Sequence, residues 1–154
     1  MILLVFSDSH GTTYGLDEAL EKEDVINGIV FCGDVAADAE YLRNRYPGIP
    51  ICSVCGNNDY FCDDPYVRMP TYEGIKMYVT HGHKERVKGG LTTLLLNAKR
   101  NECSVCLFGH THQALIETID GVTLINPGSI RSSRGTYARL EITNGNLTCD
   151  IKTI

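Results

Sequence analysis

Five short apolar runs, each ending at a glycine or a polar cluster, constrain this chain more than any other feature of its sequence. They are ILLVF before SDSHG, GIVFC before GD, IPICSVC before GNND, KMYV before THGH, and CSVCLF before GHTH. Runs of this length that are almost continuously apolar and rich in β-branched residues are typical of strands buried on both faces. We therefore expect sheets that are covered on both sides.

Three segments between the runs place apolar residues at the i, i+3, i+4 spacing of an amphipathic helix. They contain Leu16, Ala19 and Leu20; the weaker set Tyr41, Leu42 and Arg45; and Leu91, Leu94, Leu95 and Ala98. Nearer the C-terminus, alternating residues around Asp120-Gly121 and Asn144-Gly145 predict two β-hairpins. We expect a βαβα front half, a mostly antiparallel back half, and two sheets packed face to face with helices outside.

The 154 residues suffice for a single domain, 1–154, with its own core. No apolar run approaches the ~18 residues that a membrane span needs, and MILLVF is too short for a signal peptide, so we expect a cytoplasmic protein.

Seven cysteines, an odd number, are expected to remain free thiols in a reducing compartment. CSVC occurs twice, but cysteines three apart in a strand point to opposite faces, which favours buried apolar cysteines over a zinc site.

The charge balance of the chain is acidic. Lys and Arg number 14 against 19 Asp and Glu, for a formal net charge of −5. A nucleic-acid-binding surface would be basic, so we expect no nucleic-acid partner. Any phosphate chemistry in this chain also needs a local source of positive charge.

Residues of metal-ligand type follow the ends of the apolar runs. They are Asp8, His10, Asp34, Asn57, Asp59, His81, His83, His110 and His112, and they include all five histidines. Ligand sites of α/β folds lie at the carboxyl ends of strands. Residues two apart in extended chain point to one side, so Asp8 with His10, and His110 with His112, can reach a common point. The pattern predicts a metal centre at one edge of the sheets.

Together and in this order, DSHG, GD, GNND, THGH and GHTH resemble the motifs of the calcineurin-like metallophosphoesterase superfamily. The resemblance runs from Ile2 to about Arg134. The short chain and the NPGS at 126–129 are most similar to its compact prokaryotic phosphodiesterase group. The resemblance implies a four-layer αββα sandwich of two packed mixed β-sheets flanked by helices.

The resemblance also implies two divalent metal ions. Asp8, His10, Asp34 and His112 would hold the first ion, and Asp34, Asn57, His81 and His110 the second, with Asp34 bridging. Such donors suit Mn²⁺, which we favour, as well as Ni²⁺, Fe²⁺, Zn²⁺ or Mg²⁺. After the two aspartates and a bridging hydroxide are counted, a charge of about +1 faces the substrate, so an acidic protein can act on phosphate.

A hydroxide bridging the two metals is the expected nucleophile for in-line attack on phosphorus. Many phosphatases that the chain resembles carry GNH, whose histidine protonates the leaving group. Here GNND places Asn58 in that position, and an amide cannot transfer a proton. His83 or water would have to substitute, which favours phosphodiesters with good leaving groups over alkyl monoesters.

Four further residues have open roles. His83 either orients substrate or a metal-bound water, or supports His81. Asp59 orients Asn58 or a histidine, or is an exposed loop carboxylate. Arg131 and Arg134 either clamp a phosphate oxygen or belong to a solvated basic loop.

Two other functions remain open at this level. One is a catalytically weak protein-docking module on the same fold, similar to a retromer scaffold subunit. The other is a phosphomonoesterase or nucleotidase. For the enzyme, the expected partner is a small phosphoester substrate, with no membrane and with a possible homo-oligomer. Fold alone does not decide among these functions.

Overall fold

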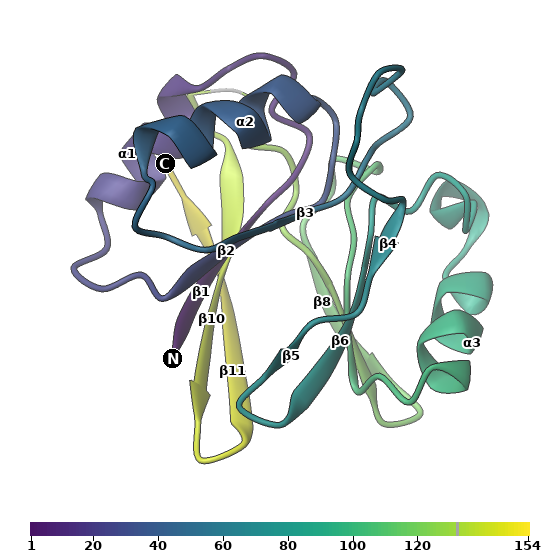
Figure 1. Cartoon of the computed structure of the whole chain (residues 1–154). Helices are drawn as coiled ribbons and strands as arrows, with labels where there is room; N and C mark the ends of the chain where they lie inside the picture. The colour runs from purple at the N-terminus through teal and green to yellow at the C-terminus, as the bar shows by residue number, and fades with distance from the viewer. Residues whose placement is uncertain (132) are drawn as a thin grey trace.

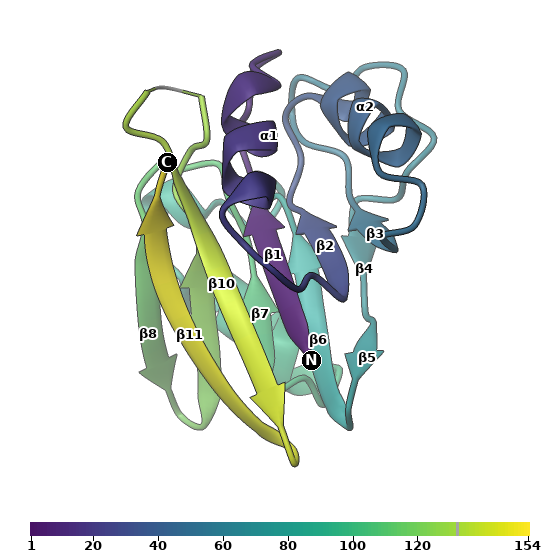
Figure 2. The same cartoon turned by 90° about the vertical axis from the view of Figure 1, so that its left-hand side faces the viewer.

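Two mixed β-sheets pack face to face in the computed structural model, which describes residues 1–131 and 133–154 (Figures 1 and 2). The first sheet has the order β11-β10-β1-β2-β3, formed by Asn146–Thr153, Thr136–Thr143, Ile2–Phe6, Gly28–Phe31 and Ile51–Ser53. The second has the order β4-β6-β7-β9-β8, formed by Val67–Arg68, Ile75–Thr80, Val105–Leu107, Val122–Asn126 and Leu115–Ile119. A further short strand, β5 (Thr71–Tyr72), pairs with β6.

Helices cover the outer face of each sheet. Helices α1 (Tyr14–Glu21) and α2 (Ala36–Arg45) lie on the first sheet, and α3 (Thr92–Arg100) and the 3-10 turn η1 (Val87–Gly89) lie on the second (Figure 1). Within the described part of the chain, no helix has the length and apolar character needed to cross a membrane. The predicted αββα sandwich is confirmed.

Three apolar clusters separate the four layers. Leu3 and Val30 of the first sheet pack against Met77 and Leu107 of the second in the central cluster. A second cluster joins the other face of the first sheet to Leu16 of α1 and Leu42 of α2, and a third joins the second sheet to Leu94 of α3. Both sheets are thus buried on two faces, as the continuous apolar runs predict.

The three expected helices and both expected hairpins are present. The turns lie at Asp120-Gly121, between β8 and β9, and at Asn144-Gly145, between β10 and β11. Most strand pairs of the back half are antiparallel, as expected, but β6, β7 and β9 run parallel to one another. Between β6 and β7 the chain crosses over through η1 and α3. This crossover lets β7 begin at the same end of the sheet as β6, which a parallel pair requires.

Parallel pairing brings the strand ends that precede the polar motifs to one edge. Strands β1, β2 and β3 are mutually parallel, as are β6, β7 and β9. A hydrogen bond then joins the two sheets at this edge, because the Nδ1 atom of His81 lies 2.8 Å from the carbonyl oxygen of Cys32. The polar loops of both sheets therefore meet in one place.

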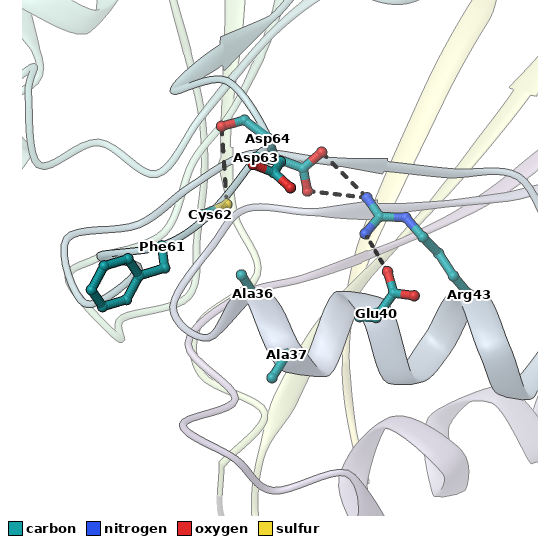
Figure 3. Close-up of a pocket in the computed structure, with 8 residues that line it drawn as sticks. All are labelled: Ala36, Ala37, Glu40, Arg43, Phe61, Cys62, Asp63 and Asp64. Carbon is teal, nitrogen blue, oxygen red and sulfur yellow. Dashed lines mark hydrogen bonds and ion pairs between the residues drawn. The ribbon is translucent and has the colours of Figure 1, made fainter.

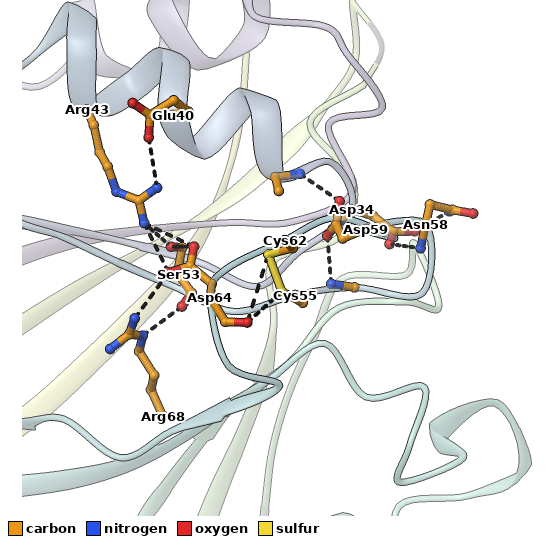
Figure 4. The surroundings of a disulfide bond; sticks show 12 residues. Asp34, Glu40, Arg43, Ser53, Cys55, Asn58, Asp59, Cys62, Asp64 and Arg68 are labelled. Carbon is orange, nitrogen blue, oxygen red and sulfur yellow. Dashed lines mark hydrogen bonds and ion pairs between the residues drawn. A yellow bond between two sulfur atoms is a disulfide. The ribbon is translucent and has the colours of Figure 1, made fainter.

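The expectation that all cysteines stay free is wrong for two of them. Cys55 and Cys62 form a disulfide with a Cα–Cα distance of 6.2 Å (Figure 4). The first CSVC does not lie wholly in a strand, because β3 ends at Ser53 and Cys55 begins a loop that folds back on itself. The other cysteines, all within the described residues, are free and buried or half-buried: Cys32, Cys52, Cys103, Cys106 and Cys149.

Candidate metal centre

The side chains of the predicted ligands converge in two overlapping groups. Asp8, His10 and His112 form the first, and Asp8, Asp34 and His81 form the second, and within each group the potential ligand atoms lie within 4.8 Å of one another. The members come from four different loops, which follow β1, β2, β6 and β7. The fold thus brings together residues as far apart in the sequence as Asp8 and His112, which are 104 positions apart.

Asp8 carries an oxygen that the protein leaves unpaired. Its Oδ2 atom accepts hydrogen bonds from the Ser7 hydroxyl at 2.6 Å and from the His110 backbone N–H at 2.9 Å. Its Oδ1 atom is buried and has no hydrogen-bond partner among the described residues. Burying an unpaired carboxylate oxygen is costly unless a cation compensates it. The Asp8 carboxylate therefore fits a metal ligand.

Histidine nitrogens surround that oxygen. The Nε2 atom of His112 lies 3.1 Å from Asp8 Oδ1 and 3.2 Å from Nε2 of His10. On the other side, Nε2 of His81 lies 4.0 Å from the same oxygen. Lone-pair nitrogens facing one another across a shared carboxylate are what a divalent cation with imidazole ligands needs.

The second group extends to Asn57 and His110. The His81 Nε2 atom lies 3.0 Å from Asn57 Oδ1, 3.2 Å from His110 Nδ1 and 3.7 Å from Asp34 Oδ2. The Cys32 carbonyl accepts from the other nitrogen of the His81 ring, which fixes the tautomer and leaves Nε2 free to bind a metal. The structure thus brings all seven predicted ligands together.

The carboxylate common to both groups is that of Asp8, whereas the resemblance implies Asp34 as the shared ligand. Asp34 is engaged elsewhere, because its Oδ1 accepts from the backbone N–H of Asn58 at 3.0 Å and its Oδ2 from the Asn58 side-chain amide at 2.6 Å. Bridging by Asp34 stays a prediction.

The ligand loops are strained. Non-glycine residues with left-handed backbone include Asp8 (φ 55°), His10 (φ 50°), Asp34 (φ 50°), His110 (φ 69°) and His112 (φ 59°). Non-glycine residues adopt this region rarely, and such strain gathers at functional sites. The backbone is bent so that these side chains turn toward one centre.

Two glycines let backbone approach the carboxylates. A Cβ atom at Gly109 would collide with the Ser7 hydroxyl and Asp8 Oδ2, and one at Gly56 would collide with Asp34 Oδ1. Only glycine fits in either place without displacing a carboxylate.

The electrostatic surroundings keep two of the histidines neutral. Burial, and next the neighbouring His81, lower the pKa of His110 to about 4. The same two causes, in the same order, lower the pKa of His83 below its ordinary value. A neutral imidazole is the form that binds a metal. His83 is correspondingly ill suited to act as an imidazolium acid at neutral pH.

Asp59 takes neither of the roles expected for it. Its Oδ2 accepts from the backbone N–H groups of Gly56 at 2.7 Å and Asp34 at 3.1 Å, and its Oδ1 accepts from Ala36 at 2.7 Å (Figure 4). The side chain is half-buried, and none of its hydrogen bonds within the described part of the chain goes to Asn58 or a histidine. It fastens the loop after β3 to the loop after β2.

Two supporting residues were missed in the sequence. Asp38 of α2 accepts from the Ser9 hydroxyl at 2.5 Å and the Gly11 N–H at 2.8 Å, which holds the His10 loop. Asn126 of NPGS donates to the Gly109 carbonyl at 2.9 Å, which holds the loop of His110 and His112. NPGS was a usable signal for Asn126, but Asp38 lies in a helix with no motif around it.

The remaining predicted residues lie around the rim. Asn58 is exposed and contacts Asp34, and the His83 ring lies 5.5 Å from that of His81. Arg131 and Arg134 are exposed in the loop between β9 and β10. Their expected contact with phosphate stays a prediction.

A hollow of about 430 Å³ lies between the N-terminal part of α2 and the disulfide loop (Figure 3). Arg43 of α2 lines it but is bonded to Glu40 at 3.4 Å and Asp64 at 3.0 Å. Phe61, also lining it, projects into solvent with its side chain fully exposed. The hollow contains none of the predicted ligands.

Comparison with known proteins identifies the family of this chain. The calcineurin-like phosphoesterase superfamily domain matches residues 1–145. The probable metallophosphoesterase YsnB of Bacillus subtilis is 33% identical over 150 residues, which cover 94% of this chain and 86% of that protein. A phosphodiesterase of Methanocaldococcus jannaschii is 25% identical, with coverage of 80% and 81%.

Solved structures share the fold. A predicted phosphoesterase from Streptococcus pneumoniae superposes with a TM-score of 0.81 at 27% identity, covering 99% of this chain and 88% of that one. Vps29 from Entamoeba histolytica, complexed with zinc, has a TM-score of 0.78 with 99% of each chain covered, and its 18% identity shows the fold alone. By its sequence motifs, its fold and these matches, this chain belongs to the calcineurin-like phosphoesterase superfamily, whose members bind divalent metals.

Proposed function

We propose that this protein hydrolyses phosphodiesters with the help of two divalent metal ions. The observation that carries the proposal is the buried, unpaired Oδ1 of Asp8, which the ring nitrogens of His112 and His81 face at 3.1 and 4.0 Å. A cation is the partner that this oxygen lacks. Bound there, a pair of ions would supply an activated water and positive charge for the phosphoryl oxygens.

The chain's own residues would hold those ions in two sets. Asp8, His10 and His112 would bind one, and Asp34, Asn57, His81 and His110 the other. Asp34 would bridge, on release of one Asn58 hydrogen bond. The set mixes imidazole nitrogen with carboxylate and amide oxygen and includes no thiolate, which suits Mn²⁺ and also Ni²⁺, Fe²⁺, Zn²⁺ or Mg²⁺.

The state of Asn58 supports a preference for diesters. Its side-chain amide donates to Asp34 at 2.6 Å, and an amide has no proton to transfer to a leaving oxygen. The neighbouring His83 has a lowered pKa, which disfavours the imidazolium form. We therefore propose that good leaving groups react fastest and that alkyl monoesters are poor substrates.

The test begins with protein stripped by a chelator and reconstituted with Mn²⁺, Ni²⁺, Mg²⁺ or Zn²⁺. We expect turnover of bis-p-nitrophenyl phosphate, about two metal equivalents by elemental analysis, and slower release from alkyl monoesters. Asp8→Asn should lower the metal content and should lower kcat/KM by at least about 100-fold. Asp120→Asn, which changes an exposed aspartate bonded to Lys99, is the matched control and should behave as wild type.

Other outcomes would favour the alternatives. Faster cleavage of alkyl monoesters than of aryl diesters would favour a phosphomonoesterase or nucleotidase. Metal binding without turnover of any substrate would favour a docking module. A small phosphoester as partner, a cytoplasmic location and self-association are proposals that accompany the enzyme.

A further inference from the structure

Three side chains form a connected cluster beside the histidines of the second ligand set. Tyr66 immediately precedes β4, and the pairing of Val67 with Thr80 places Tyr66 next to the loop that begins at His81. The Tyr66 ring lies 5.7 Å from the His83 ring, edge to face. The Nζ atom of Lys84 lies 3.4 Å from the centroid of the Tyr66 ring.

His83 connects this cluster to the metal centre. Its ring lies 5.5 Å from that of His81 and 6.2 Å from that of His110. Its Nδ1 atom is buried and has no hydrogen-bond partner among the described residues. Lys84, the next residue, lies close enough for its charge to contribute to the lowered pKa of His83. The cluster thus begins at the metal ligands and ends at a positive charge.

Tyr66 restrains a side chain that would otherwise be mobile. Lys84 is exposed, and an exposed lysine ordinarily samples many rotamers. Attraction between an ammonium group and the face of an aromatic ring favours one position. A cation that is already held beside a centre for anionic substrates can stabilise negative charge there, and its side chain need not be ordered during the reaction.

Three other basic side chains, those of Arg43, Arg68 and Lys99, are bonded to carboxylates. Arg43 and Arg68 both bind Asp64, at 3.0 and 3.1 Å. Lys99 binds Asp120 at 2.8 Å. The Lys84 ammonium, by contrast, rests on a ring, which satisfies none of its three N–H donors as an oxygen acceptor would.

We propose that Lys84, held in place by Tyr66, stabilises the leaving oxygen of the phosphodiester. The inference rests on the proposed hydrolysis. As a water-derived oxygen bonds to phosphorus, the bond from phosphorus to the leaving oxygen breaks and that oxygen takes the electron pair. The Lys84 ammonium donates a hydrogen bond to the developing negative charge and stays protonated. This role is the one that the sequence resemblance gives to the histidine of GNH in related phosphatases, and Asn58 cannot take it because an amide transfers no proton.

The experiment compares methyl aryl phosphodiesters whose leaving groups range from p-nitrophenol to phenol. Lys84→Met should lower kcat by at least about tenfold for the phenyl ester and much less for the p-nitrophenyl ester, because a poor leaving group develops more charge. Tyr66→Leu should reproduce much of this change. Tyr66→Phe, which keeps the ring, should show the same dependence of kcat on the leaving group as the wild type.

A second measurement needs neither metal nor turnover. In NMR spectra of the metal-free protein, the ring current of residue 66 should shift the ε-methylene protons of Lys84 upfield. Tyr66→Leu should abolish this shift and Tyr66→Phe should keep it. Because Lys84 is exposed, Lys84→Met should fold normally.

Lys99→Met is the matched control, since it removes an exposed lysine that is bonded to Asp120. Equal rate losses for all leaving groups in Lys84→Met, or the same steepened dependence in Lys99→Met, would overturn the role of Lys84. A wild-type protein that turns over no ester with any metal refutes the proposed function instead, so the two failures can be told apart.

Discussion

A hydrogen bond between Asp8 and His110 links the loops of the two sheets. The backbone N–H of His110, after β7, donates to Asp8 Oδ2, after β1, at 2.9 Å. The bond leaves the other Asp8 oxygen facing the histidines and sets the position of the GHTH loop relative to the DSHG loop. The ligand geometry therefore depends on backbone contacts as much as on the ligands themselves, which leads to four predictions.

Substitutions at His10, whose backbone is strained, should affect stability and metal binding differently. Asparagine tolerates φ near 50° better than alanine does, so metal-free His10→Asn should be more stable to urea than His10→Ala by about 1 kcal/mol. Both variants should bind metal more weakly than wild type by calorimetry. Equal stabilities of the two would show that the backbone at this position carries no strain.

Asn126 should matter to metal affinity although it is not a ligand. Asn126→Ala removes hydrogen bonds to the Gly109 carbonyl and the Thr111 hydroxyl, and from the Gly128 N–H. Leaving these buried groups unpaired should cost about 2–3 kcal/mol of unfolding free energy. Metal affinity should fall about 10- to 100-fold, as for other residues that orient ligands. Asn44→Ala, on the exposed face of α2, should change neither quantity.

Asp64 should give a pH-dependent contribution to stability. Burial raises its pKa, but hydrogen bonds from Ser53, Arg43 and Arg68 outweigh burial and leave the pKa below its ordinary value. A lowered folded-state pKa means that the stabilisation is full above the unfolded pKa of about 3.9 and is lost as pH falls through the folded pKa.

Asp64→Asn should therefore destabilise the protein by about 2 kcal/mol at pH 7, and the difference should shrink below pH ~4. Urea unfolding at both pH values measures it. Asp63→Asn, at the exposed neighbouring position, serves as the reference variant. A difference that stayed constant down to pH ~2 would contradict the assigned direction of the shift.

The disulfide should stabilise the loop of Asn57. Cys55 and Cys62 close a short loop that contains this ligand, so Cys55→Ser should lower the unfolding free energy by about 2 kcal/mol. The affinity for the metal that Asn57 would bind should fall as well, because the ligand becomes less ordered. Cys149→Ser, at a half-buried free thiol, tests whether the loss of a cysteine alone matters. If Cys55→Ser and Cys149→Ser had the same unfolding free energy and metal affinity, the disulfide would not have the stabilising role assigned to it.

The sequence by itself determined most of the strands and helices and marked the residues that could bind metal. Continuous apolar runs favour strands buried on two faces, and the polar residues that follow those runs are candidate ligands. These are local properties, so β1, β2 and β3 could be predicted from the apolar runs, and α1 and α3 from their helical periodicity.

The tertiary structure decided what depends on contacts between distant residues. The parallel order of β6, β7 and β9, the disulfide, and the attachment of Asp59 to backbone rather than to Asn58 leave no periodic trace in the sequence. The same holds for the sharing of Asp8 between both ligand groups and for Tyr66 beneath Lys84. Hydrogen bonds and ring contacts are fixed only when packing has brought their partners within a few ångströms, and a pattern of residue types does not contain those distances.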